Sequence, residues 1–282
     1  MTSDKPGRLL VVGTPIGNLE DFSPRAARAL AQADAILCED TRVTAKLARR
    51  FGFGAPRISC PAPREKSRST ELLRRLSEGQ TVALVTDAGM PALSDPGEHL
   101  VQAAAEAGFP VLVVPGPSAP AAALAVSGLP AIPHTFLGFL PARSGERRRF
   151  LEALRERRET LVWFEAPHRI VPSLADAARV LGPRRAVVAR EMTKLHEEVL
   201  RGTLDELAAL FEARGTGRGE ITVVVQGADA TARRRLDEGG VDEAIREALA
   251  EGRSKRAAAR DIAARSGRPA REIYARMVEL ER

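Results

Sequence analysis

Short apolar runs alternate with amphipathic segments over the first 116 residues. The runs are RLLVVG (8–13), DAILCED (34–40), PRIS (56–59), QTVALVTD (80–87) and PVLVVPG (110–116). Segments with helical spacing separate them, and strands separated by helices of about 10–15 residues are typical of a parallel sheet covered by helices. We therefore expect an N-terminal α/β domain over residues 1–116.

The predicted helices carry start and stop signals. Ser23 and Pro24 provide a cap and a first-turn proline, and Gly52 ends the segment that begins at Thr41. A further helix is expected over 66–78. Asp95-Pro96 repeats the acid-proline pattern and predicts a helix over 95–108.

The same alternation begins again after Gly116. A small-residue helix is expected over 118–128, and strands over 160–167, 184–192 and 219–227; KLHEEVLRG (194–202) is a candidate neighbour of the second of these strands. We expect a second α/β domain over 117–228, both domains having mainly parallel sheets. Residues 229–282 predict a polar linker and three short helices divided by Gly252 and Gly267.

The charge balance favours a polyanionic partner. The 282-residue chain has a formal net charge of +6 and a pI of about 10.0. Only five of its 43 basic residues are lysine. Such a strong arginine bias can also arise from genome composition. The charge alone therefore does not decide whether the partner is a nucleic acid.

Other function classes are disfavoured by what the composition lacks. Cys38 and Cys60 have no paired spacing, and the four histidines are scattered, so neither a disulfide framework nor a metal site is expected. No apolar run approaches the roughly 20 residues of a membrane helix, and the first residues lack the apolar stretch of a signal peptide. We expect a cytoplasmic protein.

Loops rich in glycine, proline and acid follow several predicted strands, at the sheet edge where open α/β sheets bind ligands. They are GTPIGN (13–18), EDTRVT (39–44), TDAGMPALSDPG (86–97), PGPSA (115–119) and FEAPHR (164–169). In GTPIGN the third glycine of a dinucleotide loop is absent and Pro15 lacks an N–H donor. Glycine and proline also simply terminate strands, but five such loops together favour a binding site.

These loops, with GFLP (138–141) and AREMTK (189–194), occur in an order that resembles the bacterial 16S rRNA cytidine 2′-O-methyltransferases of the decoding region, within the tetrapyrrole methylase superfamily. The resemblance runs from about Leu9 to Gly227, and the tail is similar to the helical C-terminal domain of that family. One motif departs: the family carries a His-Asn-Glu element where this chain reads SCPAPREKSR (59–68), which keeps only Glu65.

The resemblance implies S-adenosylmethionine held between the two α/β domains, usually in a homodimer. Ile16 is then expected near the methyl-transfer end of the cleft. Phe164 would contribute from the second domain. The remaining implied cofactor contacts are Asp87, Gly89, Met90, Pro91, Leu93, Ser118 and Ala119.

A ribose 2′-hydroxyl is a weak nucleophile and gains from a positioned base. The candidate catalytic residues are Glu39, Asp40, Arg42, Glu165, His168, Glu191 and Lys194. Structural roles compete with these: Glu39 and Asp40 beside Arg42 can form an ion pair, and His168 after Pro167 can begin a helix.

The expected partner is 16S rRNA or the small ribosomal subunit, and no membrane. Candidate RNA-binding residues are Arg190, Arg253, Lys255, Arg256 and Arg260, which would contact phosphates without reading sequence. A solvated charged face is the competing interpretation. Two other functions stay open: a tetrapyrrole methyltransferase, which would not need a basic tail, and a non-catalytic RNA-binding protein, which would not need a recessed cleft.

Overall fold

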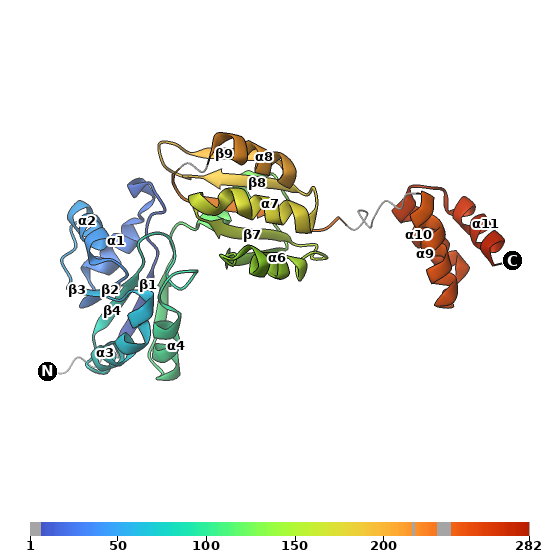
Figure 1. Ribbon diagram of the computed structural model, residues 1–282. Helices are drawn as coiled ribbons and strands as arrows, with labels where there is room; N and C mark the ends of the chain where they lie inside the picture. Colours follow the sequence, from blue (N-terminus) through green and yellow to red (C-terminus); the bar gives the residue numbers. More distant parts are fainter. Residues whose placement is uncertain (1–6, 216–217, 230–237, 282) are drawn as a thin grey trace. The chain divides into compact units, whose positions relative to one another are not determined.

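A computed structural model of the protein describes residues 7–215, 218–229 and 238–281 (Figure 1). Contacts between residues divide the chain into two compact units. The first contains Met1–Leu154 and Thr160–Gln226, and the second contains Arg155–Glu159 and Gly227–Arg282. Each unit is described by itself.

The first unit begins with a five-stranded parallel sheet in the order β3-β2-β4-β1-β5. We call this sheet and its helices the first lobe. Each apolar run of the N-terminal half forms one strand, as the sequence predicts: β1 (Arg8–Val12), β2 (Ala35–Cys38), β3 (Arg57–Ser59), β4 (Thr81–Val85) and β5 (Val111–Val114).

Helices cover both faces of the first sheet, because the strands are apolar on both sides. One face packs on α1 (Pro24–Ala31) and α2 (Thr41–Phe51), through residues such as Leu30 and Leu47. The other packs on α3 (Glu65–Ser77) and α4 (Glu98–Glu106), through residues such as Leu72 and Leu100. Two short 3-10 helices, η1 (Leu19–Asp21) and η2 (Ala62–Arg64), lie in the connections.

The expected signals of α1 and α2 are confirmed. The Ser23 hydroxyl accepts a hydrogen bond from the Ala26 N–H, Pro24 is the first helical residue, and Gly52 ends α2 in the left-handed region with φ 75°.

The predicted start of α4 was wrong. The helix begins at Glu98, and Asp95 and Pro96 belong to the preceding loop. Its cap comes from another helix: Glu65 Oε1 accepts from the N–H groups of Gly97 (3.0 Å), His99 (2.6 Å) and Leu100 (3.3 Å). A carboxylate at a helix N-terminus satisfies these amides and complements the helix dipole. Local sequence could not reveal a cap that comes from more than 30 residues away.

The second sheet has the order β6-β7-β10-β8-β9 and, with its helices, forms the second lobe. Its strands are β6 (His134–Phe139), β7 (Thr160–Glu165), β8 (Arg185–Arg190), β9 (Glu198–Thr203) and β10 (Ile221–Val225). Parallel pairing, which is complete in the first sheet, is found here only between β6 and β7; the other neighbours are antiparallel. The β8–β9 connection, residues 191–197, is too short for the crossover of about a dozen residues that parallel strands need. The expected pairing of KLHEEVLRG with its neighbour is confirmed.

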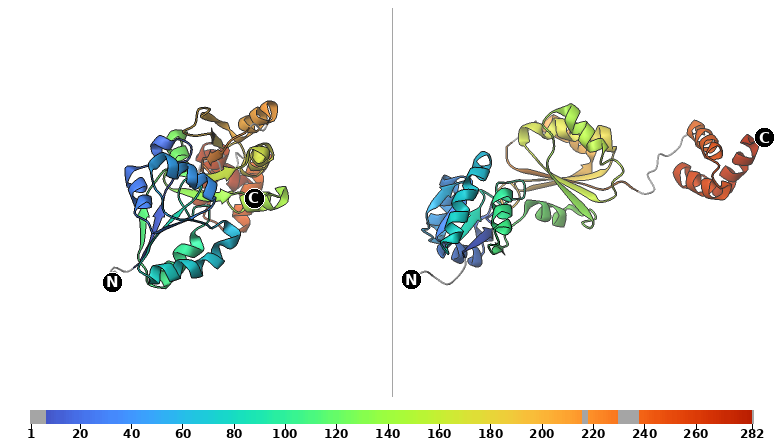
Figure 2. Two further views of the ribbon diagram at one scale, coloured as in Figure 1. Left: turned by 90° about the vertical axis from the view of Figure 1, so that its left-hand side faces the viewer. Right: turned by 90° about the horizontal axis from the view of Figure 1, so that it is seen from below.

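Helices also cover both faces of the second sheet (Figure 2). On one face lies α5 (Ala119–Ser127), which packs Ala123 and Leu124 on the strands. On the other lie α6 (Ser144–Glu152), α7 (Ile170–Leu181) and α8 (Leu204–Arg214), around the buried Trp163. The 3-10 helix η3 (Pro167–Arg169) leads from β7 into α7.

The second unit contains three helices with a hydrophobic core of their own, which we call the tail. They are α9 (Glu238–Ala250), α10 (Lys255–Ser266) and α11 (Ala270–Leu280), packed through Ile245, Ile262, Ile273 and Met277. Gly252 and Gly267 interrupt them with φ 66° and 71°, as the sequence predicts. Residues 230–237 of the expected linker lie outside the described residues. The domain boundaries at 116 and 228 stay predictions.

None of the helices in the described ranges has the length and apolarity needed to cross a membrane.

Candidate active site

The glycine loop after β1 is packed against another strand-end loop. A Cβ added at Gly13 would lie 2.6 Å from the Cα and N atoms of Gly116, which follows β5. Thr14 and Gly89 exchange backbone hydrogen bonds of 2.9 and 3.2 Å. Glycine at position 13 is therefore required by contact between two loops, which brings three strand-end loops of the first lobe together.

Gly17 in the same loop meets the second lobe. A Cβ there would lie 2.6 Å from Lys194 Cγ and 2.7 Å from Thr193 Oγ1, and the Asn18 N–H donates to Thr193 Oγ1 (3.1 Å). The β8–β9 connection that supplies these contacts has non-glycine residues at positive φ: Glu191 (51°) and Thr193 (66°). A sharply turned loop of the second lobe thus lies directly on the β1 loop.

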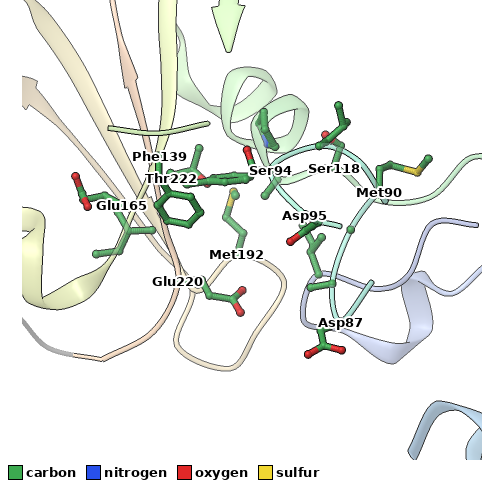
Figure 3. A pocket seen from close by; sticks show the side chains of 18 of the residues that line it. Asp87, Met90, Ser94, Asp95, Ser118, Phe139, Glu165, Met192, Glu220 and Thr222 are labelled. Carbon is green, nitrogen blue, oxygen red and sulfur yellow. The ribbon is translucent and has the colours of Figure 1, made fainter. Parts of the chain in front are cut away.

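A cavity of about 410 Å³ lies between these loops, and we call it the larger cavity. Its size falls in the range of small-molecule sites, about 300–1,000 Å³. Figure 3 shows Asp95 and Ser118 on one side of the cavity and Phe139, Met192 and Thr222 on the other, while the side chains of Asp87 and Met90 are turned away from its middle. Both lobes build its wall.

The apolar part of this wall is aromatic and sulfur-rich. Phe164 contacts Phe139 with ring centroids 5.5 Å apart and Phe136 at 5.0 Å. Met90, Met192 and Ile16 add flexible or branched apolar surface. Such a surface suits a flat heterocycle and a sulfur-bearing chain.

The polar part of the wall is acidic. Burial, and then the charges of Glu39, Asp87 and Glu220, raise the pKa of Asp95 to about 6. Burial also raises the pKa of Glu39 and of Asp87, each reinforced by neighbouring carboxylates. In the part of the chain that the structure describes, no group of His, Cys, Asp and Glu is arranged to hold a metal ion. The carboxylates are therefore available to an organic ligand.

The cavity fits S-adenosylmethionine. The N-terminus of α5 opens onto it at Ser118, whose side chain makes no capping hydrogen bond, so backbone N–H groups are free to meet a carboxylate. The acidic residues suit a sulfonium and an ammonium group, and the aromatic wall suits adenine. The small residues Gly89 and Ala119 let a ligand approach the backbone.

Most of the predicted cofactor contacts come together in the larger cavity. Ile16, Asp87, Gly89, Met90, Leu93, Ser118, Ala119 and Phe164 all line it. Pro91 is buried beside them and is not part of the lining. Their contact with the cofactor stays a prediction.

The predicted catalytic residues are more dispersed. Glu39 and Glu165 line the larger cavity, whereas Asp40, Arg42 and His168 do not. Arg42 is 87% exposed and its Nη2 lies 2.6 Å from Asp40 Oδ2. This guanidinium lowers the pKa of Asp40 to about 2. Asp40 also caps α2 by accepting from the Arg42 N–H, a structural role that the sequence left open.

Glu165 and His168 lie at the β7–α7 junction. Glu165 is buried, with Oε1 3.1 Å from Arg169 Nε and accepting from the Ala166 N–H (2.9 Å). In Figure 3 its carboxylate is turned away from the middle of the cavity. His168 lies exposed within η3, where the sequence's alternative interpretation placed it at a helix start.

Lys194 connects two acidic residues of the second lobe. Its Nζ lies 2.7 Å from Glu191 Oε1 and 3.2 Å from Glu220 Oε2. Burial lowers the pKa of Lys194, but the two carboxylates outweigh it and raise the pKa overall; Lys194 in turn lowers that of Glu191. Lys194 therefore acts first as a structural cation in the β8–β9 loop.

The predicted RNA-binding residues lie in both units. Arg190 at the end of β8 donates to the Arg218 carbonyl (2.8 Å) and lies 3.7 Å from Glu198. In the tail, Arg253 lies 3.6 Å from Asp261 and Lys255 pairs with Glu281. Arg253, Arg256 and Arg260 are all exposed, and the last two lie one turn apart on α10.

Several residues of the larger cavity were missed from the sequence: Ser94, Asp95, Phe139, Met192, Glu220 and Thr222. Asp95 was assigned to a helix start. Phe139 and Met192 lie within GFLP and AREMTK, so the motifs were the available signal. Glu220 and Thr222 had none, because their position depends on the order of strands in the second sheet.

Comparison with known proteins identifies the family. The family model described as Tetrapyrrole (Corrin/Porphyrin) Methylases matches residues 8–208. These residues include both sheets up to β9 and most of the larger cavity.

Two curated relatives carry the name "Ribosomal RNA small subunit methyltransferase I". The one from a Synechocystis species is 41% identical over 276 residues, covering 98% of this chain and 99% of its own length. The one from Thermotoga maritima is 46% identical over 221 residues, covering 78% of this chain and 99% of its own length.

Solved structures share the fold. The methyltransferase CobJ aligns with a TM-score of 0.61 at 21% identity, covering 82% of this chain and 97% of its own. Uroporphyrin-III C-methyltransferase from Thermus thermophilus, solved with S-adenosylhomocysteine, aligns with a TM-score of 0.51 at 24% identity, covering 77% and 92%.

Proposed function

We propose that this chain, which belongs to the tetrapyrrole methylase family, methylates the 2′-hydroxyl of a cytidine in the decoding region of 16S rRNA. As a methyltransferase of that family, it uses S-adenosylmethionine as its methyl donor. One observation carries the choice of substrate: a protein named for rRNA small subunit methylation is 41% identical over 98% of this chain. The match therefore extends through the tail, which a small-molecule methylase does not need.

For methyl transfer to a ribose, this chain has to orient the donor and the acceptor and to remove the proton of the 2′-hydroxyl. The donor supplies an activated methyl group; the new bond from ribose O2′ to the methyl carbon forms as the carbon–sulfur bond breaks, and the hydroxyl proton must leave. We propose that Asp95 is the base that accepts this proton. Its pKa of about 6 leaves it ionised at neutral pH, and its carboxylate points into the larger cavity (Figure 3). Glu39 is the second carboxylate in reach of the same space.

The decisive experiment maps the product. Small ribosomal subunits from a strain lacking this protein are incubated with the protein and methyl-labelled S-adenosylmethionine, and the labelled nucleotide is identified by nuclease digestion and mass spectrometry. A 2′-O-methylcytidine in the decoding region is the expected result. Label in another nucleotide, or transfer only to a porphyrinoid offered in a parallel reaction, would contradict the proposal.

The tail serves substrate binding in this proposal. Arg256 and Arg260 present two exposed cations on α10, and phosphate contacts of this kind add affinity without sequence preference. Deleting residues 241–282 is expected to weaken binding to small subunits and to leave binding of S-adenosylmethionine unchanged. Loss of both would mean that the tail is needed for folding.

We also propose that the chain is a homodimer. The edge strand β5 exposes Leu112 (46%) and Val113 (58%), and α5 exposes Val126 (41%). Apolar side chains on an unpaired strand edge are typical of an interaction surface. Light scattering is expected to give twice the 30.3 kDa chain mass. Val113→Glu is expected to shift it to the monomer, and a monomeric wild-type protein would contradict the proposal.

A further inference from the structure

A second cavity of about 310 Å³ lies beside the larger one, and we call it the smaller cavity. The two share Ile16, Asp87, Ala88 and Glu220 in their walls. A ligand in the smaller cavity would therefore be separated from the larger cavity only by these shared residues. That is the relation that a methyl acceptor must have to its donor, because the reacting atoms have to meet at van der Waals distance.

The walls of the smaller cavity combine apolar and hydroxyl-bearing side chains. Leu19 of η1 and Val43 and Leu47 of α2 provide the apolar surface. Thr14, Thr44 and Thr86 provide hydroxyl oxygens, which can only accept here because each hydroxyl already donates to a backbone carbonyl. A nucleobase needs an apolar surface for its ring faces and hydrogen-bonding groups for its edges, and enzymes that act on a nucleotide of structured RNA take it out of the stack into such a pocket.

Two of the five lysines of the chain line this cavity, although arginine is its predominant cation. Their surroundings differ. Lys194 is held by Glu191 and Glu220, so its charge is already compensated. Lys46 on α2 is exposed and has no ion-pair partner within residues 7–215, 218–229 and 238–281. An uncompensated ammonium group beside an apolar cavity is a binding group for a phosphate.

We propose that the smaller cavity receives the acceptor nucleotide, with its base against Val43 and Leu47 and its phosphate on Lys46. This inference rests on the proposed function, since it assumes that the acceptor is RNA. It assigns α2, which carries the EDTRVT motif at its start, to substrate binding. Asp40 then positions α2 by capping its N-terminus, at the end next to the cavity.

The competing occupant is the donor itself. A donor whose amino-acid end extended past Ile16 and Asp87 would also bring a carboxylate close to Lys46. The two alternatives differ in which affinity depends on the lysine: the affinity for small subunits in our proposal, and the affinity for S-adenosylmethionine in the other.

The test compares Lys46→Ala with Lys46→Arg and with Lys66→Ala. Lys66 is a matched control, since it is an exposed lysine on α3 of the same lobe and lines neither cavity. Steady-state methylation of unmodified small subunits gives kcat and KM at several salt concentrations, and calorimetry gives the Kd of S-adenosylmethionine. All four proteins are compared by circular dichroism and thermal unfolding.

For Lys46→Ala we expect KM for small subunits to rise about tenfold, with kcat and the Kd of S-adenosylmethionine unchanged. The slope of log KM against log salt is expected to fall by about one, because one phosphate contact is lost. Lys46→Arg is expected to keep the wild-type slope, and Lys66→Ala to match the wild type throughout.

An unchanged KM and salt slope in Lys46→Ala, with normal methylation by the wild type, would overturn the acceptor site and leave the proposed function intact. A weaker affinity for S-adenosylmethionine would overturn it in favour of the donor. Failure of the wild-type protein to modify small-subunit RNA in the same assay would overturn both proposals.

Discussion

The larger and the smaller cavity share four residues of their walls and differ in their charge. The larger one gathers Glu39 and Asp95 in addition to the shared Asp87 and Glu220, whereas the smaller one adds Lys46 and Lys194 to the same two carboxylates. The more acidic cavity suits a cationic methyl donor, and in the other cavity the lysines offset the carboxylates where an anionic RNA would bind. The backbone that separates them is shared, and its position depends on Gly13 and Gly17.

The strongest test of whether the two cavities act separately is to fill only one of them. Ala119→Trp places an indole where α5 opens onto the larger cavity, so affinity for S-adenosylmethionine is expected to fall more than about a hundredfold. Binding to small subunits, measured by filter retention, is expected to stay within about twofold because the phosphate contacts lie elsewhere. Ala105→Trp, on the exposed side of α4, is the control. Equal loss of both affinities would show that the cavities do not act separately.

Removing the proposed base is expected to have the next largest effect. Asp95→Asn keeps the shape of the larger cavity but cannot accept the proton, so kcat at pH 8 is expected to fall about a hundredfold. The Kd of the donor is expected to rise far less. A kcat within about threefold of the wild type would exclude Asp95 as the base and leave Glu39 as the candidate.

The same variant has an opposite effect on stability. The pKa of Asp95 is raised to about 6 from 3.8, so the folded state favours the neutral acid, and this contribution to stability is lost as pH rises from about 4 to 6. Asp95→Asn is therefore expected to be more stable than the wild type at pH 8 and equal to it below pH 4. Because Asp95 is partly exposed, we expect a gain of only about 1 kcal/mol, measured by calorimetry.

Removing the cap of α4 would test whether Glu65, which lines neither cavity, holds the loop from Thr86 to Gly97 in place. Glu65→Ala leaves the amides of Gly97, His99 and Leu100 without their carboxylate, which is expected to cost about 3 kcal/mol of unfolding free energy. Donor affinity is expected to fall as well, since Asp87 and Asp95 lie in this loop. Denaturant titration with Glu78→Ala as the exposed control would measure it, and an unchanged midpoint would contradict the capping role.

The smallest effect is expected at the Asp40–Arg42 pair. The pair lines neither cavity and Arg42 is largely exposed. Arg42→Ala is therefore expected to change the single-turnover methylation rate by less than about twofold, with no measurable change in melting temperature. A large loss of rate would return the pair to the catalytic residues that the sequence suggested.

The elements of this fold were predictable because their signals are local. Apolar runs bounded by glycine and proline became the strands, and Ser23 and Gly52 marked helix ends as capping rules require. Strand order was not local: β10 lies between β7 and β8, and nothing in the sequence near Ile221 shows it.

In the site, only the residues that belong to recognisable motifs were predictable from the sequence. Met90 and Ser118 belong to loops whose sequences indicate ligand binding, and both line the larger cavity. Asp95 was assigned to a helix start because its surroundings resemble one, and the true cap, Glu65, becomes visible only once α3 and α4 are packed together. The pairing of Lys194 with Glu220 likewise joins residues that only the folded sheet brings together.

The cap supplied by Glu65 also gives one position of the segment around it a role in another helix. Within residues 59–68, Glu65 supplies the carboxylate that three amides at the start of α4 require. An engineer who redesigns this segment therefore has to keep Glu65, and also has to keep the core filled at the buried Cys60. In an alignment of distant sequences, the hydrogen bonds to the amides of α4 therefore identify Glu65 as the position of this segment to align first.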